Sequence, residues 1–433
     1  MSKNPLIYHG EWWVPAPQDP GMCSTFLEDP RKMMGLEKKY TGTLTYYEDK
    51  DSTLELYLYP SNIHASYYHK NNVMWGRDAN GNIFTLFNVT IKEQPGFDFT
   101  NTKFVVTYIL VGEHVPSVGD VRFGSCIVQF PYFRNWAFHD NITRSNAAST
   151  VSYRIPIKAE KLLETFHEEG VYWRIMQHHI AQKSTFDLTI TQTTMFEIEA
   201  VKDFSIWSYL KHIEEFAQFL SIALYCDQYS TGVKFINKEN KHESVFLYRK
   251  NVPVDPKALS LVKFGLLKDK LPSMLYIWHK NFKNIAPISS YLIESLQKNK
   301  NKFDVPDFLI IAQALDGYHK RFVNKKDGKD IRKYEDQIEI LLEQFEDVKA
   351  IQQCKIKPVV LRDSRHKYSH LYPDEEKSLA VEGEDLYWLT EKCKILLTCC
   401  ILDMLGLTNK EINLCLEQSP ISQIIDSLPL EYD

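Results

Sequence analysis

The sequence predicts an α+β protein in which a β-rich N-terminal domain, of the sandwich or barrel-like kind, precedes an all-α helical bundle. Three observations predict this class. Apolar residues alternate with polar ones through most of the first 200 residues, they recur at helical spacing in the last third of the chain, and aromatic residues crowd into the first half of the 433 residues. The predicted boundaries are 1–200 for the β-rich domain, 201–302 for a mixed connecting region and 303–433 for the helical domain.

Short segments with an apolar residue at every second position predict the strands of the first domain. Turn residues such as Asn80-Gly81 and Pro95-Gly96 separate them. We expect strands over 40–48, 53–59, 83–90, 103–111, 121–130, 150–157, 171–177 and 185–199, and one short helix near 159–169. Trp12, Trp13 and Trp136 are interpreted as core or edge-strand aromatics, and a sensing surface for a partner is the alternative.

The apolar period changes to that of a helix after residue 201. The pattern from Phe204 to Leu224 predicts a long amphipathic helix over 203–225. Two strands (232–237 and 243–249), two helices (271–282 and 288–298) and a lysine-rich boundary (297–302) are expected next. The C-terminal block is predicted to contain a helix that starts after Asp304-Val305-Pro306, a second over 331–345, and a very apolar third over 383–405 that is central to the bundle or an interface.

Charge and cysteine content restrict the class of protein. The 51 Lys and Arg residues nearly balance the 56 Asp and Glu residues, so any RNA contact must come from a local patch and not from a basic coat. The eight cysteines form no Cys-x-x-Cys pair and no Cys/His zinc spacing, which indicates reduced, buried thiols. Without an apolar leader or a run of about 18 apolar residues, a soluble cytoplasmic protein with no membrane partner is expected.

The stretch from Val360 to His370 carries the densest chemistry of the chain. It places Arg362, Arg365, His366 and His370 within nine residues. An arginine presents a fork of donors that suits a phosphate, and a histidine can give or take a proton near neutral pH. The combination indicates phosphodiester chemistry, whereas a solvated or capping cluster at a helix start is the structural alternative.

The spacing of Arg365 and His370, Arg-x4-His with polar His366 directly after the arginine, resembles the active motif of HEPN-domain ribonucleases. The helices around it, over about 305–405, are similar in order to a HEPN helical bundle. The phrase Ala314-Leu315-Asp316-Gly317-Tyr318-His319-Lys320-Arg321 is similar to the first helix of the Apea-type HEPN domain. The family more often has Asn after the motif arginine, so whether His366 or His370 is the chemical histidine stays open.

The layout of the whole chain resembles the ApeA-type antiphage proteins. The phrases that carry this resemblance in the first domain are Gly10-Glu11-Trp12-Trp13-Val14-Pro15, Gly42-Thr43-Leu44-Thr45 and Phe130-Pro131-Tyr132-Phe133-Arg134-Asn135-Trp136. The resemblance implies that the β-rich domain senses or restrains and that the HEPN domain cuts RNA once infection is detected.

The implied activity is that of a metal-independent endoribonuclease of abortive-infection defence. His370 would act as general acid or base at the 2′-hydroxyl or the leaving 5′-oxygen, and Arg365 would hold the phosphate. Neither a cofactor nor a metal is expected. The expected partners are RNA, a second copy of the chain bound through the HEPN domain, and a phage-derived trigger. The supporting or RNA-contact candidates are His366, Arg362, Asp316 and His319.

Helix geometry constrains this pair. Five residues of a regular helix turn through about 500°, so Arg365 and His370 would point roughly 140° apart. The two converge if the backbone is irregular, if the long arginine bends back, or if two subunits contribute. The stretch itself is expected to be a linker between two bundle helices.

Two other functions stay open. A non-catalytic HEPN module would bind RNA or protein without cutting it. Arg365 to Tyr372 also fits Arg-x4-His-x-Tyr, which resembles HEPN toxins controlled by a nucleotidyltransferase partner. In that case Tyr372 would be the modified residue.

Overall fold

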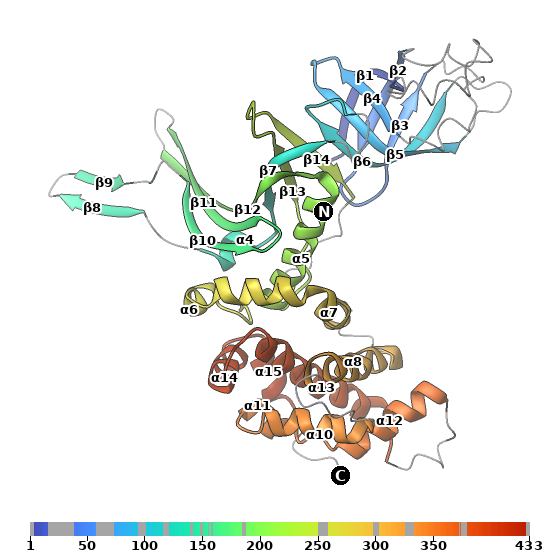
Figure 1. Cartoon of the computed structure of the whole chain (residues 1–433), viewed down its shortest axis with the longest axis vertical. Coiled ribbons are helices and arrows are strands. Elements are labelled where there is room, and N and C mark those ends of the chain that lie inside the picture. Colours follow the sequence, from blue (N-terminus) through green and yellow to red (C-terminus); the bar gives the residue numbers. More distant parts are fainter. Residues whose placement is uncertain are drawn as a thin grey trace.

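The computed structural model describes residues 4–15, 39–57, 73–93, 101–115, 121–138, 142–147, 150–154, 156, 159–183, 188–249, 259–297, 303–324, 333–371, 373 and 379–429. Figure 1 shows a β-rich N-terminal half above a helical C-terminal half, which confirms the predicted α+β class. The lysine-rich segment predicted as a domain boundary lies, from residue 298 to 302, outside the described residues. The domain boundaries therefore stay a prediction.

The first part of the chain is a closed barrel. Its strands lie in the order β6-β3-β2-β1-β4-β5, and a pairing between β5 and β6 closes the ring. Trp12, Phe84 and Phe104 are fully buried inside it, because inward and outward side chains alternate along each strand. The strands are β1 (Leu6–Trp13), β2 (Tyr40–Tyr46), β3 (Ser52–Leu56), β4 (Val73–Asp78), β5 (Ile83–Glu93) and β6 (Thr102–Val111).

A second group of antiparallel strands continues from the barrel in the order β14-β13-β7-β12-β11-β10. The two groups share β6, which pairs with β3 through its first half and with β14 through residues 108–111. β8 and β9 form a separate ribbon that projects to one side in Figure 1. The strands are β7 (Arg122–Gln129), β8 (Thr143–Ala147), β9 (Thr150–Arg154), β10 (Glu160–His167), β11 (Val171–Lys183), β12 (Leu188–Ser205), β13 (Gly232–Ile236) and β14 (Glu243–Tyr248).

The short helix predicted near 159–169 is wrong, because this segment forms strand β10. β10 pairs with β11 and carries a register shift between Lys161 and Leu163. The shift turns both Leu162 and Leu163 inward. Two adjacent apolar residues break the alternation that is typical of a strand and fit the apolar pattern of a helix instead. Pairing with a long neighbouring strand therefore decides the local structure.

Two long helices lie beneath the sheet. Helix α5 (Ile206–Leu224) starts at Ser205, whose hydroxyl accepts a hydrogen bond from the backbone N–H of Ser208 at 3.2 Å. Helix α7 (Leu271–Gln297) is one helix where two were predicted, and Pro287 lies inside it. A proline removes one backbone hydrogen bond, and the apolar face that α7 buries on both sides compensates for this loss. Two short helices, α4 (Phe133–Trp136) and α6 (Phe264–Leu267), complete this layer.

The C-terminal bundle follows α7. Its central helix is α13, on which Leu396, Cys399 and Leu402 are fully buried, as its apolar sequence predicted. The elements are α8 (Val305–Tyr318), the π-helix η1 (His319–Val323), α10 (Tyr334–Gln344), α11 (Lys349–Cys354), α12 (Pro358–His370), α13 (Gly383–Met404), α14 (Asn409–Glu417) and α15 (Ile421–Asp426). The seven cysteines among the described residues are buried thiols and not disulfides.

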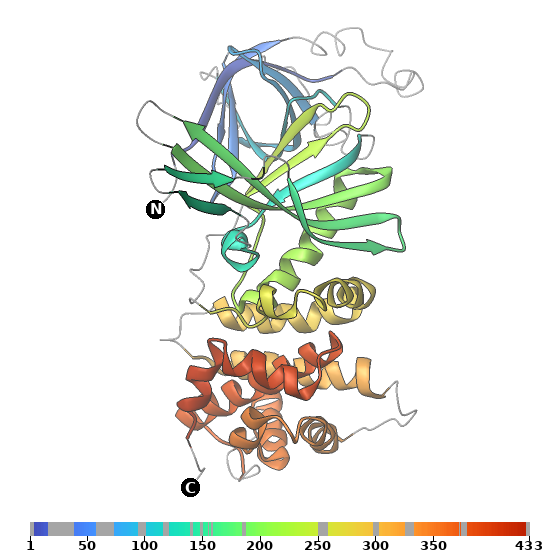
Figure 2. The ribbon, with the colours of Figure 1, turned by 90° about the vertical axis from the view of Figure 1, so that its left-hand side faces the viewer.

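One hydrophobic core runs from the sheet through α5 and α7 into the bundle, which Figure 2 shows as successive layers. Two of the aromatic residues considered for a sensing surface, Trp12 and Trp136, are buried, and the Trp136 indole donates to the carbonyl of Val262 at 2.6 Å. Trp13 is partly exposed and lies edge-on against His114. Within the described residues, no helix is both long and apolar enough to cross a membrane.

Candidate functional site

The Arg/His stretch lies on helix α12, so the prediction of a linker is wrong. Lys357 precedes the helix and Pro358 is its first residue, a position where the missing N–H costs nothing. The helix ends at Leu371, which adopts a left-handed conformation with φ of 54°. The polar residues of this stretch outnumber its apolar ones, which led to the prediction of a linker. In the structure, one side of the stretch is buried against the bundle as a helix.

Helix α12 has a buried half and a solvent-facing half. Leu361, Asp363, Ser364 and Lys367 are buried against the bundle. The hydroxyl of Ser364 accepts a hydrogen bond from the backbone N–H of Val381 at 3.1 Å, which ties the helix to the segment before α13. The partly or fully exposed residues on the other half are Arg362, Arg365, His366, Ser369 and His370. The structure thus gathers both arginines and both histidines of the motif on one accessible surface, which we call the α12 face.

Arg365 is held in place by two neighbouring helices. Its Nη2 atom donates to Oδ2 of Asp316 on α8 at 3.3 Å, and its guanidinium lies over the ring of Tyr334 on α10 at 4.5 Å. Tyr334 is itself fixed, because its hydroxyl donates to the carbonyl of Ala312 at 3.0 Å. Asp316 also binds Lys320 at 3.0 Å. The arginine is therefore oriented before any ligand arrives.

Arg362 is held in the same manner one turn earlier. It binds Asp363 at 2.9 Å and also binds Glu335 on α10. The hydrogen bond that Arg362 donates to Asp363 and the charge of Glu335 raise the pKa of this guanidinium. Both arginines of the α12 face are consequently paired with carboxylates from the body of the bundle.

The two histidines lie one helical turn apart. The rings of His366 and His370 are separated by 6.1 Å between centroids, and His370 is the more exposed of the two. Helix α12 is α-helical through all of its 13 residues, so an irregular backbone does not bring Arg365 to His370. The side chain of Arg365 bends toward Asp316. Arg365 and His370 therefore occupy opposite flanks of the α12 face.

The remaining candidates lie elsewhere. Asp316 is next to Arg365, as described above. His319 is fully buried at the start of η1, so it lies in the core and not on the α12 face. Tyr372 lies outside the described residues. Sequence reasoning missed the role of Tyr334 and Glu335, because nothing in an isolated α10 pattern shows that its first turn faces the arginines of a later helix.

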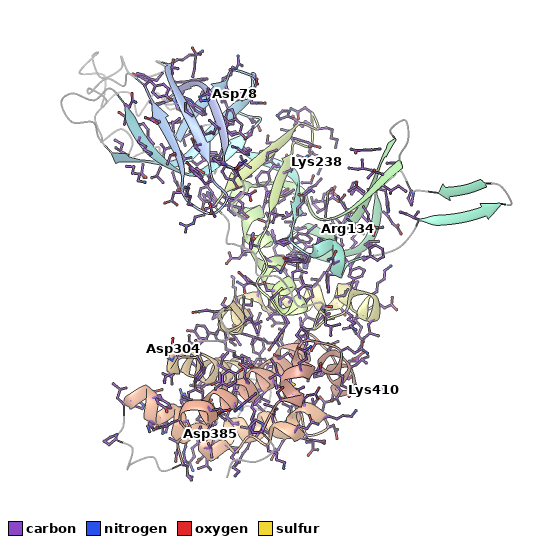
Figure 3. All side chains as sticks on the ribbon, turned by 180° about the vertical axis from the view of Figure 1, so that it is seen from behind. Asp78, Arg134, Lys238, Asp304, Asp385 and Lys410 are labelled. Carbon is purple, nitrogen blue, oxygen red and sulfur yellow. The ribbon has the colours of Figure 1, made fainter. Side chains whose placement is uncertain are left out.

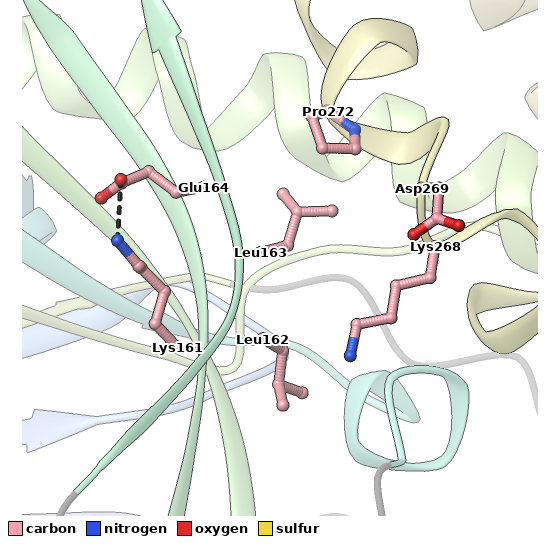
Figure 4. A pocket seen from close by; sticks show the side chains of 7 residues that line it. All are labelled: Lys161, Leu162, Leu163, Glu164, Lys268, Asp269 and Pro272. Atoms are coloured by element: carbon pink, nitrogen blue, oxygen red, sulfur yellow. Dashed lines mark hydrogen bonds and ion pairs between the residues drawn. The ribbon is translucent and has the colours of Figure 1, made fainter.

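A surface hollow of about 370 Å³ lies far from these residues in sequence. Figure 4 shows it between β10 and the start of α7, with Lys161, Glu164, Lys268 and Asp269 at its rim. Lys161 binds Glu164 at 2.8 Å there. None of the candidate residues lines it.

Comparison with known families finds two matches. The description "Apea-like HEPN" matches residues 309–411, which contain most of α8 and all of α10 and α12 with the α12 face, so the helical part is a HEPN domain of a generally ribonuclease-like family. The description "ApeA N-terminal domain 1" matches residues 7–273, more than half of the chain. The chain therefore belongs to the ApeA family, as an ApeA-type protein with a C-terminal HEPN domain, and this family is one of nuclease-type antiphage defence. Neither a curated protein nor a solved structure matches.

Proposed function

We propose that the chain is a metal-independent endoribonuclease whose active site is the α12 face. The observation that carries this proposal is the fixed position of Arg365, which Asp316 and Tyr334 hold at an accessible surface that also carries two histidines. A buried arginine with a carboxylate partner would be only a structural ion pair. An oriented arginine at the surface of a HEPN domain is suited to bind a phosphate.

The guanidinium can hold Asp316 and a phosphate at the same time. It has five N–H donors, and the contact with Asp316 engages Nη2. Its remaining donors would bind the non-bridging oxygens of the scissile phosphate and offset the charge that grows on them. Because Asp316 fixes the arginine, little side-chain entropy would be lost on binding.

A histidine would supply the proton transfers. One imidazole would take the proton of the 2′-hydroxyl as that oxygen attacks phosphorus, and a second imidazole would give a proton to the departing 5′-oxygen. The bond to the 5′-oxygen breaks as the bond to the 2′-oxygen forms. The products are a 2′,3′-cyclic phosphate and a 5′-hydroxyl, and DNA is not a substrate because it lacks the attacking hydroxyl. Exposed His370 is the better placed histidine, and His366 is the second.

The separation of Arg365 and His370 on α12 leads to a composite site. Since the helix is regular, we propose that a dimer places Arg365 of one subunit opposite His370 of the other. A two-fold axis next to the α12 face would create two such sites. The β-rich part would restrain this activity until a phage-derived trigger binds, because unrestrained RNA cleavage would kill the cell.

The test uses the purified full-length chain with total cellular RNA in a buffer that contains no Mg²⁺. We expect Arg365→Ala and His370→Ala to lower the cleavage rate about 10²–10⁴-fold. Lys410→Ala, which removes an exposed charge from α14 (Figure 3), is the matched control and should cleave as the unchanged protein does. End-group analysis should find the cyclic phosphate.

Four outcomes would contradict the proposal. Cleavage of DNA would exclude the 2′-hydroxyl mechanism, and a strict requirement for added Mg²⁺ would exclude metal independence. If both variants fold and cleave RNA at the rate of the unchanged protein, the α12 face is not the active site. Binding of RNA without any cleavage, under conditions that activate defence, would instead identify a non-catalytic HEPN module.

A further inference from the structure

A second group of ionisable side chains lies in the interior, at the joint between the β-rich part and α7. His212 and Glu215 come from α5, and His279 comes from α7. We propose that these three residues bind a divalent transition metal, with Zn²⁺ as the best-suited ion. This site is separate from the α12 face, and its role is to clamp the two parts of the chain together.

The donor atoms are close enough to share one ion. One ligand atom from each of the three residues lies within 4.8 Å of the other two. His279 Nδ1 lies 2.7 Å from Oε2 of Glu215, and His212 Nδ1 lies 3.8 Å from the same oxygen. Bonds of about 2.0–2.2 Å in a tetrahedral zinc site place neighbouring ligand atoms roughly 3.3–3.5 Å apart. The observed separations lie on either side of this range, so small side-chain rotations would suffice.

The side chains of His212 and Glu215 are buried, which favours a bound ligand at this position. Glu215 is 1% exposed and His212 is 5% exposed. His212 Nδ1 makes no hydrogen bond within the described part of the chain. Buried polar atoms without a partner are rare, because each costs free energy that an ion or a water would recover. Two histidines and a glutamate form a donor set that zinc accepts.

His167 lies next to this group, but the set of ligand atoms within 4.8 Å of one another does not include it. It lies at the end of β10, is fully buried, and neither of its ring nitrogens has a hydrogen-bond partner among the described residues. Its ring centroid lies 4.3 Å from that of His279.

The surroundings complete the site. His279 Nε2 lies 2.8 Å from Oε2 of Glu169, a carboxylate that would orient the ring and fix which nitrogen faces the ion. Trp173 and Phe204 each have their ring 5.9 Å from that of His212 and exclude water from one side. The carboxylates of Glu215 and Glu169 match the two charges of the ion, and Nζ of Lys211 lies 3.7 Å from Oε1 of Glu215.

The position of the site gives its role. His167 and Glu169 belong to the sheet and its turn, whereas His279 belongs to the helix that packs against the bundle. Farther along α7, the carbonyl of Asn284 accepts a hydrogen bond from Arg321 of η1 at 2.7 Å. An ion bound at this joint would therefore fix α7, and with it the bundle, to the sheet.

The experiment measures metal content and thermal stability, so it does not depend on RNA cleavage. The untagged full-length chain is stripped with a chelator, incubated with ZnSO₄ and separated from unbound metal by gel filtration. We expect about one zinc per chain by elemental analysis, together with a higher melting temperature. MgCl₂ should cause neither, because magnesium prefers oxygen ligands.

Variants locate the ion. Glu215→Gln keeps the size of the side chain, and we expect it to lose the zinc and the zinc-dependent rise in melting temperature. Glu214→Gln, at the exposed neighbouring position on α5, is the matched control and should keep both. If the unchanged protein retains no zinc and its melting temperature does not respond to zinc, the proposal is overturned. Equal stabilisation by magnesium, or full zinc retention by Glu215→Gln, would also overturn it.

Discussion

Arg365 on α12 and Asp316 on α8 lie 3.3 Å apart, and this contact fixes the arginine of the proposed active site to the body of the bundle. Forty-eight residues lie between them in the sequence, so only the fold brings them together. The carboxylate of Asp316 is 13% exposed, which places the contact at the edge of the accessible surface.

Asp316→Asn should slow RNA cleavage and leave RNA affinity nearly unchanged. The amide cannot balance the guanidinium charge, so the arginine would sample other positions, and a displaced catalytic group costs about tenfold or more in rate. Single-turnover kinetics and a separate RNA-binding titration would distinguish rate from affinity. Asp385→Asn, at an exposed position in the first turn of α13, is the control. A wild-type rate in Asp316→Asn would show that this contact does not position Arg365.

Mixing two inactive variants should restore activity if the site is shared between subunits. Random exchange of Arg365→Ala and His370→Ala chains makes half of the dimers mixed, and each mixed dimer has one of its two composite sites intact. We therefore expect about one quarter of the unchanged activity after mixing. The measurement is the cleavage rate after the two proteins have been refolded or expressed together. Activity no higher than that of the separate variants would assign Arg365 and His370 to the same subunit, or would show that no such dimer forms.

Gly76→Ala should destabilise the barrel. A methyl group at this position would lie 2.1 Å from a ring carbon of fully buried Trp12, so the strand or the ring must move. Overpacking of this kind typically costs about 1–3 kcal/mol in the free energy of unfolding. Urea denaturation provides the measurement. Gly265→Ala is the control, because no atom lies within 4 Å of its added methyl group and alanine favours the helix α6.

Glu411 should contribute to stability at neutral pH and lose that contribution in acid. Its carboxylate accepts from Lys270 at 2.7 Å and from the backbone N–H of Thr408 at 2.9 Å, and these bonds lower its pKa to about 2. A folded-state pKa below the unfolded one stabilises the fold above pH 4.5, and the effect disappears as the pH falls toward 2.

The measurement compares Glu411→Gln with the unchanged protein by urea denaturation from pH 7 to pH 3. Since the side chain is partly exposed, we expect a loss of about 0.5–1 kcal/mol at pH 7. The difference should shrink as the pH falls. Glu339→Gln, at an exposed position on α10, is the control. A difference that stays constant with pH would contradict the assigned pKa.

The sequence predicted the class of fold because the period of its apolar residues is a local property. The helix over 203–225 and the strands near 232–237 and 243–249 correspond to α5, β13 and β14. The prediction failed where contacts with neighbouring elements determine the local structure. A strand partner turned the 159–169 segment into β10, and packing on both sides kept α7 intact through Pro287.

The candidate site shows the same difference between local motifs, which the sequence predicts, and contacts that depend on tertiary packing. The motif itself is local, so Arg365 and His370 could be proposed as a catalytic pair before their surroundings were known. Tyr334 was visible only as an apolar position of a helix, and its place beneath Arg365 depends on how α10 and α12 pack. The proposed metal ligands could not be grouped from the sequence, because His212 and Glu215 lie on α5 and His279 lies on α7, in a separate segment of the chain.

Strand β6 belongs to the barrel and to the larger sheet at once, since β3, β5 and β14 all pair with it. Loss of this one strand would open the barrel and detach the sheet from it in the same step. The barrel and the larger sheet should therefore unfold together as a single cooperative unit. In a fragment that contains only the barrel residues, residues 108–111 of β6 would lack their pairing with β14. The boundary of an independently folding N-terminal piece must lie beyond β14.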